Sequence, residues 1–279
     1  MTGLQLSADI LGAALIHPEA FHRGTPQKRL RFWSAWVGIF LFTIYCFYTL
    51  GFFDIPRLIS GFEKLFGVVS FMLPPKAHGR TWVFLHALLE TLGMAFLGTL
   101  LASLASVPLG FLGAKNVVSN RLFHFTLRRF VDFLRGIDAL IWALVWINVV
   151  GLGPFAGILA IAVTNTGELS KLFSEAIENV DHKPMEGVRS CGANAVQTIR
   201  FAVLPQVFPV ILSNSLYYFE SNTRSATILG IVGAGGIGLQ LADRIRVMAW
   251  DQVSVLIIMI LITVYGIDAL SNRVRQQFI

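Results

Sequence analysis

Charge is scarce in this sequence. Charged residues make up 14% of the 279 residues, whereas ordinary soluble domains contain about 25%. Hydrophobic residues make up 55%, and Phe alone occurs 23 times. This balance excludes a disordered chain, a fibrous repeat and most soluble enzymes. It is typical of one polytopic membrane domain, and it leaves no room for a large domain outside the membrane.

Residues that make reactive or metal-binding sites are also scarce. The two cysteines, Cys46 and Cys191, lie far apart, and neither has the partners that a disulfide, a zinc site or a nucleophilic thiol needs. The six histidines include no pair at metal-ligand spacing. We therefore predict no metal site and no catalytic site in this chain.

Long apolar runs predict an all-α membrane protein with six transmembrane helices. A spanning helix needs about 20 mostly apolar residues. The first run is too long for a signal-peptide core and ends in bulky residues, so it is predicted to span rather than to be cleaved. The predicted spans cover residues 32–53, 84–108, 130–150, 155–173, 206–230 and 252–272.

Lys and Arg are unevenly distributed between the predicted loops, and this predicts that both termini are cytoplasmic. Arg135 and Arg224 fall within predicted helices. Six basic residues fall outside under this topology: Arg57, Lys64, Lys76, Arg80, Arg244 and Arg246. Fourteen fall inside: Arg23, Lys28, Arg29, Arg31, Lys115, Arg121, Arg128, Arg129, Lys171, Lys183, Arg189, Arg200, Arg273 and Arg275.

Three regions follow from this topology. Residues 1–31 are predicted to be a cytoplasmic N-terminal segment. Residues 32–84 hold the first transmembrane helix and an amphipathic helix at 55–72, which either lies in the outer interface or covers the bundle. Residues 85–279 form the core, with a long cytoplasmic loop at about 174–205.

The long loop contains a short predicted helix, from Met185 to about Cys191, after a "HKP" sequence that we read as helix-breaking. From the residues alone it is either a solvated loop or a lever toward a cytoplasmic partner. Its spacing resembles the motif of ABC importer permeases: E-A-A, three residues, G, nine residues, I, one residue, L-P. Both alanines and the isoleucine are substituted here. The matching positions are Glu186, Gly187, Val188, Gly192, Leu204 and Pro205.

Three further stretches resemble the phosphonate-type ABC transporter permease subunits. They are "FAGILA" at 155–160, "LSKLFSEAIENVD" at 169–181 and "FESNTRSATILGIVGAGGIG" at 219–238. The resemblance covers the chain from about residue 85 onward. It implies an importer for a phosphorus oxyanion such as a phosphonate, phosphite or hypophosphite, and it does not choose among them.

The resemblance also implies a type I permease fold, an inner-membrane location and a set of partners. A second copy of the chain would complete the pathway in the lipid bilayer. Two copies of an ATPase would dock on the coupling helices, and an external binding protein would deliver the solute. The chain has no Walker A pattern. We therefore expect no cofactor in this chain, with ATP and Mg bound by the ATPase, and no nucleic acid partner.

Charges within predicted spans are candidate functional residues, because they are costly in a membrane. Glu220 and Arg224 stand four residues apart on one helix face. Either they form a structural salt bridge, or Arg224 lines the pathway and meets the anion while Glu220 aids release. The polar residues between them, Ser221, Asn222 and Thr223, join the candidate pathway.

Five other charged residues lie in or near the predicted spans. Arg135 and Asp138 are predicted to form an inner-gate pair or a packing pair near the inner end of the third span. Glu90, Glu168 and Asp268 are assigned to the ends of helices.

The sequence from residue 233 to 238 matches the G-x-G-x-x-G fingerprint through Gly233, Gly235 and Gly238. That fingerprint binds a dinucleotide only after a β-strand, and here it follows a membrane span. We predict that Gly233, Gly235, Gly236 and Gly238 serve close helix packing or form a gating hinge.

Two other classes of function stay open. One is an importer of the same architecture for another solute, such as an amino acid. The other is an intramembrane enzyme or a channel. An enzyme would need catalytic groups paired at one depth, and a channel would work without an ATPase.

Overall fold

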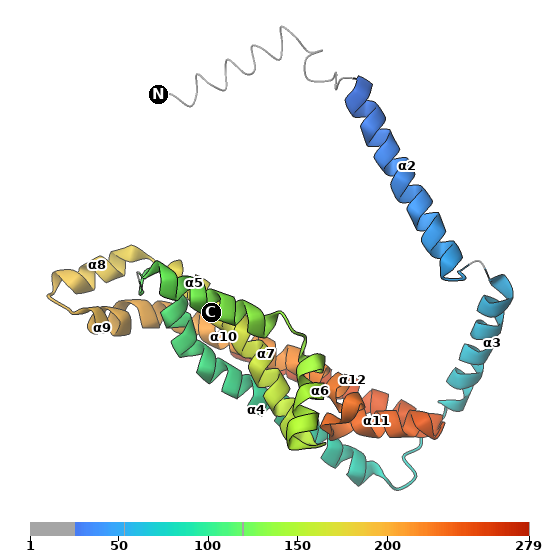
Figure 1. The fold of residues 1–279 in the computed structure, drawn as a ribbon. Coiled ribbons are helices and arrows are strands. Elements are labelled where there is room, and N and C mark those ends of the chain that lie inside the picture. Colours follow the sequence, from blue (N-terminus) through green and yellow to red (C-terminus); the bar gives the residue numbers. More distant parts are fainter. Residues whose placement is uncertain (1–25, 53, 119, 279) are drawn as a thin grey trace. The chain divides into compact units, whose positions relative to one another are not determined.

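The computed structural model describes residues 26–52, 54–118 and 120–278, with side chains from residue 32 to residue 276. Every regular element among these residues is a helix, which confirms the all-α prediction (Figure 1). The chain divides into two units, residues 1–67 and residues 68–279. Each unit is described by itself.

The first unit contains α2 (Pro26–Thr49) and most of α3 (Ile55–Phe71). The stretch Phe32–Thr49 forms one helix that is long and apolar enough to cross a membrane, as the first predicted span requires. Its side chains are exposed except for half-buried Cys46, as suits a helix that faces lipid. The helix predicted at 55–72 forms α3, and its place in the outer interface or on the bundle stays a prediction. Most of the N-terminal segment predicted at 1–31 lies outside the described residues.

The core of the second unit is built from α4 (Thr81–Gly113), α7 (Pro154–Glu178), α10 (Leu204–Leu229) and α12 (Trp250–Phe278). Helix α7 is central, because its buried residues lie on every side of the helix. Its most extensive contact is with α4. A Cβ on Gly98 or Gly110 of α4 would lie 2.7 Å from an α7 side chain, so small residues permit this close approach.

The described residues contain four helices long and apolar enough to cross a membrane, or five if a bent pair is counted as one span. Six spans were predicted, and the predicted fourth one, α7, is not in this set. Four charged residues interrupt its second half: Glu168, Lys171, Glu175 and Glu178. Because α7 is surrounded by other helices, it needs less apolar surface than a helix that faces lipid.

The predicted third span at 130–150 is wrong as a continuous helix. The chain forms α5 (Arg121–Arg135) and α6 (Ala139–Val150), which meet at an angle of 83°. The break has a local cause. Gly136 caps α5, and the Asp138 carboxylate accepts a hydrogen bond from the Leu140 N–H at 2.8 Å, so it caps the start of α6.

The two ends of the second unit differ (Figure 1). One end carries α8 (His182–Ser190) and α9 (Ala195–Thr198), followed by the π-helix η1 (Ile199–Val203), which leads into α10. The other end carries the π-helix η2 (Gly230–Ala234) and α11 (Gly236–Arg246), next to the start of α4. Helix α11 was not predicted.

Candidate functional site

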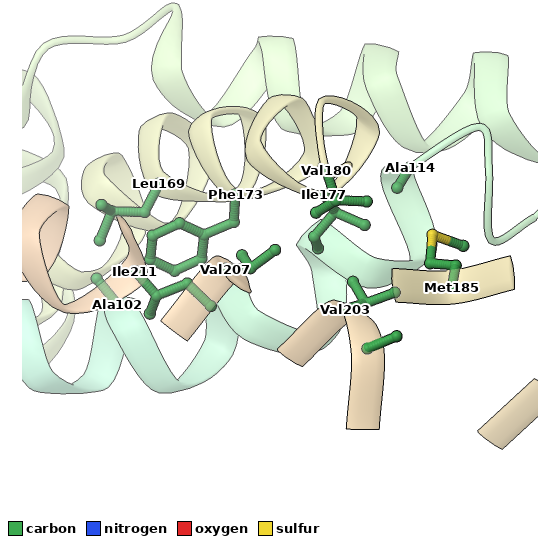
Figure 2. Close-up of a cluster of buried hydrophobic side chains, with 11 residues drawn as sticks. Ala102, Ala114, Leu169, Phe173, Ile177, Val180, Met185, Val203, Val207 and Ile211 are labelled. Carbon is green, nitrogen blue, oxygen red and sulfur yellow. The ribbon is translucent and has the colours of Figure 1, made fainter. Parts of the chain in front are cut away.

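Helix α8 carries the first part of the predicted coupling motif, and an apolar cluster fixes it to the core. Met185 is buried in this cluster together with Ile177 of α7 and Val180 just after it (Figure 2). Val203 at the end of η1 and Val207 in the first turn of α10 complete the contact. The helix begins three residues earlier than predicted. Asp181 caps it, and Pro184 lies in its first turn rather than breaking it.

The three motif residues of α8 are divided between two faces of the helix. Val188 packs half-buried against the apolar cluster, while Glu186 and Gly187 are exposed. Lys183 and Ser190 are exposed as well, and at 100° per residue they share the face of Glu186 and Gly187. Helix α8 therefore presents a polar face outward, while its apolar face holds it to the core.

The turn after α8 is made by Gly192. Its backbone φ is +81°, in the left-handed region that favours glycine. Its N–H donates to the Arg189 carbonyl at 2.9 Å. Asn194 then starts α9 with a capping box to Gln197. These local bonds reverse the chain direction within a few residues.

Gln206 contributes to the site, and the sequence analysis missed it. Its side-chain Oε1 accepts from the Asp181 N–H at 3.1 Å, and its Nε2 donates to the Ala202 carbonyl at 2.8 Å. The start of α8 is therefore tied to the start of α10. Leu204 and Pro205 open α10 as predicted, with Pro205 in the first turn.

A network of four charged residues joins α10 to α12. Arg224 Nη2 lies 3.6 Å from Glu220 Oε1, and Arg224 Nη1 lies 3.8 Å from Asp268 Oδ2. Arg275 Nη2 lies 3.4 Å from Glu220 Oε2. The Glu220 side chain is 15% exposed and the Arg224 side chain 50% exposed. Glu220 thus counters two guanidinium groups, and the four formal charges cancel.

The five candidate pathway residues do not share one surface. Glu220 and Arg224 face α12, whereas Asn222 and Thr223 are buried. Asn222 Nδ2 donates to Thr99 Oγ1 at 2.8 Å, which places this turn level with the middle of α4. Ser221 is half-buried between these two faces.

Several predictions about other charges are wrong. Arg135 pairs with Asp132 at 3.1 Å, while Asp138 caps α6. Glu90, Glu168 and Asp268 lie within α4, α7 and α12, not at their ends. Each has a partner that the local sequence does not reveal: the Gly236 N–H for Glu90, Tyr218 for Glu168 and Arg224 for Asp268.

The glycine-rich turn lies where η2 meets α11. It follows a helix rather than a β-strand, which agrees with our rejection of a dinucleotide site. Its backbone is held from α4: the Gly236 N–H donates to Glu90 Oε2 at 3.1 Å, and the Ile237 N–H donates to Thr91 Oγ1 at 2.8 Å. A Cβ on Gly238 would overlap the Thr227 carbonyl oxygen. This geometry is that of close helix packing, and a hinge stays a prediction.

The arrangement as a whole combines a projecting polar helix, a packed membrane core and guanidinium groups countered by carboxylates. These are features of a membrane transport subunit. The chain matches, over residues 106–278, the family described as the binding-protein-dependent transport system inner membrane component. The chain belongs to this family, and it is a transport permease rather than an enzyme.

Two relatives are named as permeases of phosphite or phosphonate transport systems. The phosphite transport system permease protein PtxC of Stutzerimonas stutzeri is 35% identical over 84% of this chain and 84% of its own length. The putative cryptic phosphonate transport system permease protein PhnE2 of Escherichia coli is 50% identical over 43% of this chain and 99% of its own length.

A solved structure shares the fold. The match is to inward-facing conformations of the MetNI methionine ABC transporter, with a TM-score of 0.64 and 21% identity. It covers 73% of this chain and 100% of that chain. The fold is therefore that of a type I ABC importer permease, as the coupling motif predicted.

Proposed function

We propose that this chain is the membrane subunit that moves a phosphonate, or a related phosphorus oxyanion such as phosphite or hypophosphite, into the cytoplasm. The observation that carries the proposal is the 35% identity to a phosphite permease over most of both chains. The two guanidinium groups beside Glu220 are in keeping with an anionic solute.

The chain works with partners in this proposal. Two copies form the permease, and an external binding protein supplies the solute. Two ATPase subunits bind ATP and Mg and dock on the exposed face of α8. The exposed positions Glu186 and Gly187 support this contact, because a groove can reach them without disturbing the apolar anchor of the helix.

The packing supports a route for movement from α8 to the pathway. Met185 of α8 and Val203 and Val207 near the start of α10 belong to one apolar cluster. Packed clusters transmit displacement because they have low compressibility. A shift of α8 would therefore move α10. Glu220 and Arg224 lie on α10 and face α12, so the movement would reach this charge network.

Arg224 is the residue proposed to meet the anion. Its side chain is half exposed although Glu220 and Asp268 pair with it, so an entering oxyanion can approach it. The two carboxylates compete for the same guanidinium group and would favour release. Gly192, Leu204 and Pro205 shape the coupling segment, and the turn at Gly233, Gly235, Gly236 and Gly238 bounds the opposite end.

Both termini are proposed to be cytoplasmic, with α8 on the same side. The support is the excess of Lys and Arg in the segments assigned to the inside. Single cysteines at positions 76 and 183, in a variant lacking Cys46 and Cys191, test this topology. Position 76 should react with an impermeant thiol reagent in intact cells, and position 183 only after lysis.

An importer for another solute, such as an amino acid, is the main alternative. The methionine transporter structure is 21% identical and so speaks for the fold alone. A channel would conduct without an ATPase, and an intramembrane enzyme would convert its substrate rather than accumulate it.

Reconstituted transport tests the proposal. The permease, its ATPase and its binding protein are placed in vesicles, and uptake of phosphite, a phosphonate and methionine is measured with and without ATP. ATP-dependent uptake of a phosphorus oxyanion is the expected result. ATP-dependent uptake of methionine alone, or uptake of any solute without ATP, would contradict it.

A further inference from the structure

A pocket partly lined by basic side chains lies between α4, α5 and α7. Its volume is about 200 Å³, and it lies away from the network on α10 and α12. Four basic side chains line it, and Asp132 is the one acidic residue among its lining residues. The basic residues are Arg128, Arg129, Arg135 and Lys171.

The basic groups are only partly neutralised. Asp132 lies 3.6 Å from Arg129 and 3.1 Å from Arg135, so one carboxylate serves two guanidinium groups. Arg128 and Lys171 turn to Glu178 and Glu175, which do not line the pocket. The pocket wall therefore carries an excess of positive charge.

Two buried hydroxyl groups add an independent observation. Ser170 is 2% exposed and Ser174 is 6% exposed, and both line the pocket. Within the part of the chain that the structure describes, neither hydroxyl has a hydrogen-bond partner. A serine in a helix commonly bonds the carbonyl four residues before it, and a buried hydroxyl without a partner is costly. A bound group with acceptor oxygens would remove that cost.

A close backbone contact between α5 and α7 lies beside the pocket, and α5 also carries an exposed apolar face. A Cβ on Gly167 of α7 would lie 2.7 Å from the Arg135 backbone nitrogen, so α5 and α7 are packed backbone to backbone. Leu122, Phe130 and Phe133 project from α5 and are exposed, on a face away from Arg128. Exposed aromatic and aliphatic groups beside a basic face are typical of a helix at a membrane interface.

We propose that this pocket binds a phosphorus–oxygen anion, either the headgroup of an anionic phospholipid or free phosphate. Guanidinium groups match the geometry of phosphate oxygens, and the two serine hydroxyls supply further donors from α7. The site is separate from the transport pathway proposed above. The test of this proposal therefore does not depend on which solute is transported.

Thermal unfolding in nanodiscs tests the site and separates the two sources. The purified protein is compared in phosphatidylcholine alone, in phosphatidylcholine with added phosphatidylglycerol, and in phosphatidylcholine with inorganic phosphate at constant ionic strength. A higher unfolding midpoint with phosphatidylglycerol identifies the headgroup. A higher midpoint with inorganic phosphate identifies the free anion, and either result supports the site.

Variants link the effect to this pocket. Arg129→Gln should weaken the apparent affinity for the effective probe about tenfold, as expected for the loss of one charge-assisted hydrogen bond. The Ser170→Ala/Ser174→Ala variant should unfold without probe at the wild-type midpoint or above it, because two unpaired hydroxyls are gone. It should lose most of the increase in midpoint that the probe causes.

Arg246→Gln is the matched control, since Arg246 is also an exposed arginine paired with an aspartate three residues away, at 3.9 Å. It should keep the full increase in midpoint. The proposal is overturned if neither probe raises the midpoint of the wild-type protein. It is also overturned if the Arg129 and serine variants respond as strongly as the Arg246 control.

Discussion

One glycine at each end of the core, Gly192 and Gly238, is required for a different reason. After α8, Gly192 has a φ of +81°, and none of the described residues would have an atom within 4 Å of a Cβ placed there. Within the first turn of α11, Gly238 has no positive φ to explain it, yet a Cβ there would overlap the Thr227 carbonyl oxygen. The first glycine is required by backbone conformation and the second by space.

The difference shows how the two ends are built. The end with α8 presents an open, polar surface and is attached through Met185 and Gln206. The end with α11 is packed backbone to backbone and is held by Glu90 and Thr91. A partner can approach the first end freely, whereas the second end tolerates little change.

The largest effect is expected for Gly238→Ala. The added methyl group meets a backbone atom that no side-chain rotation can move, so the cost should reach at least about 3 kcal/mol, the upper part of the usual range for overpacking. Membrane assembly should fail, as measured by size-exclusion chromatography in detergent. Gly93→Ala is the control, because no described residue lies within 4 Å of its Cβ position. Equal yields of the two variants would contradict the packing.

Substitution of Glu220 and substitution of Arg224 should lower the stability of the protein by different amounts. Glu220→Gln leaves both Arg224 and Arg275 without their shared carboxylate, at a cost of about 3 kcal/mol. Arg224→Gln should cost about 1 kcal/mol or less, since the arginine is half exposed. Thermal unfolding checks the order, and an equal loss from both substitutions would contradict the geometry.

The double variant Glu220→Gln/Arg224→Gln then separates the two roles of Arg224. If Arg224 meets the solute, the double variant should assemble, hydrolyse ATP with the binding protein and ATPase present, and still transport poorly. Full transport by the assembled variant would leave only the structural salt bridge.

There is space for a side chain at Gly192, but the left-handed backbone conformation there disfavours one. Gly192→Leu should cost about 1–2 kcal/mol through the left-handed backbone and place an apolar group on the surface proposed for the ATPase, so uptake should stop while the protein stays in the membrane. Gly192→Asn is the matched control, since asparagine accepts this conformation, and it should fold better. Normal uptake and normal ATPase co-purification with the leucine variant would refute the assignment.

A loss of stability as small as that of Arg224→Gln is expected for Gln206→Ala. It removes the bond to the Asp181 N–H, which is exposed enough to bind water instead, so stability should fall by about 1 kcal/mol. The start of α8 should become more mobile, which hydrogen exchange at residues 181–185 would detect. Unchanged exchange there would show that Met185 alone positions the helix.

Apolar runs and short motifs allowed much of this architecture to be predicted. The runs located α2, α4, α10 and α12 because lipid requires long uncharged helices. The break between α5 and α6 was missed because Gly136 and Asp138 were assigned to a helix interior, although a glycine followed by an N-cap residue is a recognisable signal.

The long-range partners of the charged residues could not be predicted. Arg275 lies 55 positions from Glu220, and Gly236 lies 146 positions from Glu90, so no local spacing links them. A signal was present in Asp268, since a carboxylate inside a membrane helix requires a partner. Which cation it would find depends on how α10 and α12 pack.

Cross-linking tests the central claim, that the exposed face of α8 docks on the ATPase, most directly. A single cysteine replaces Gly187 on this face, in a variant without Cys46 and Cys191, and the complex is treated with a short bifunctional reagent. The control cysteine replaces Met248, which is exposed before α12 near the opposite end of the core. We predict a cross-link to the ATPase from position 187 and none from position 248. No cross-link from 187 in a complex that still transports, or a cross-link from 248, would contradict the account.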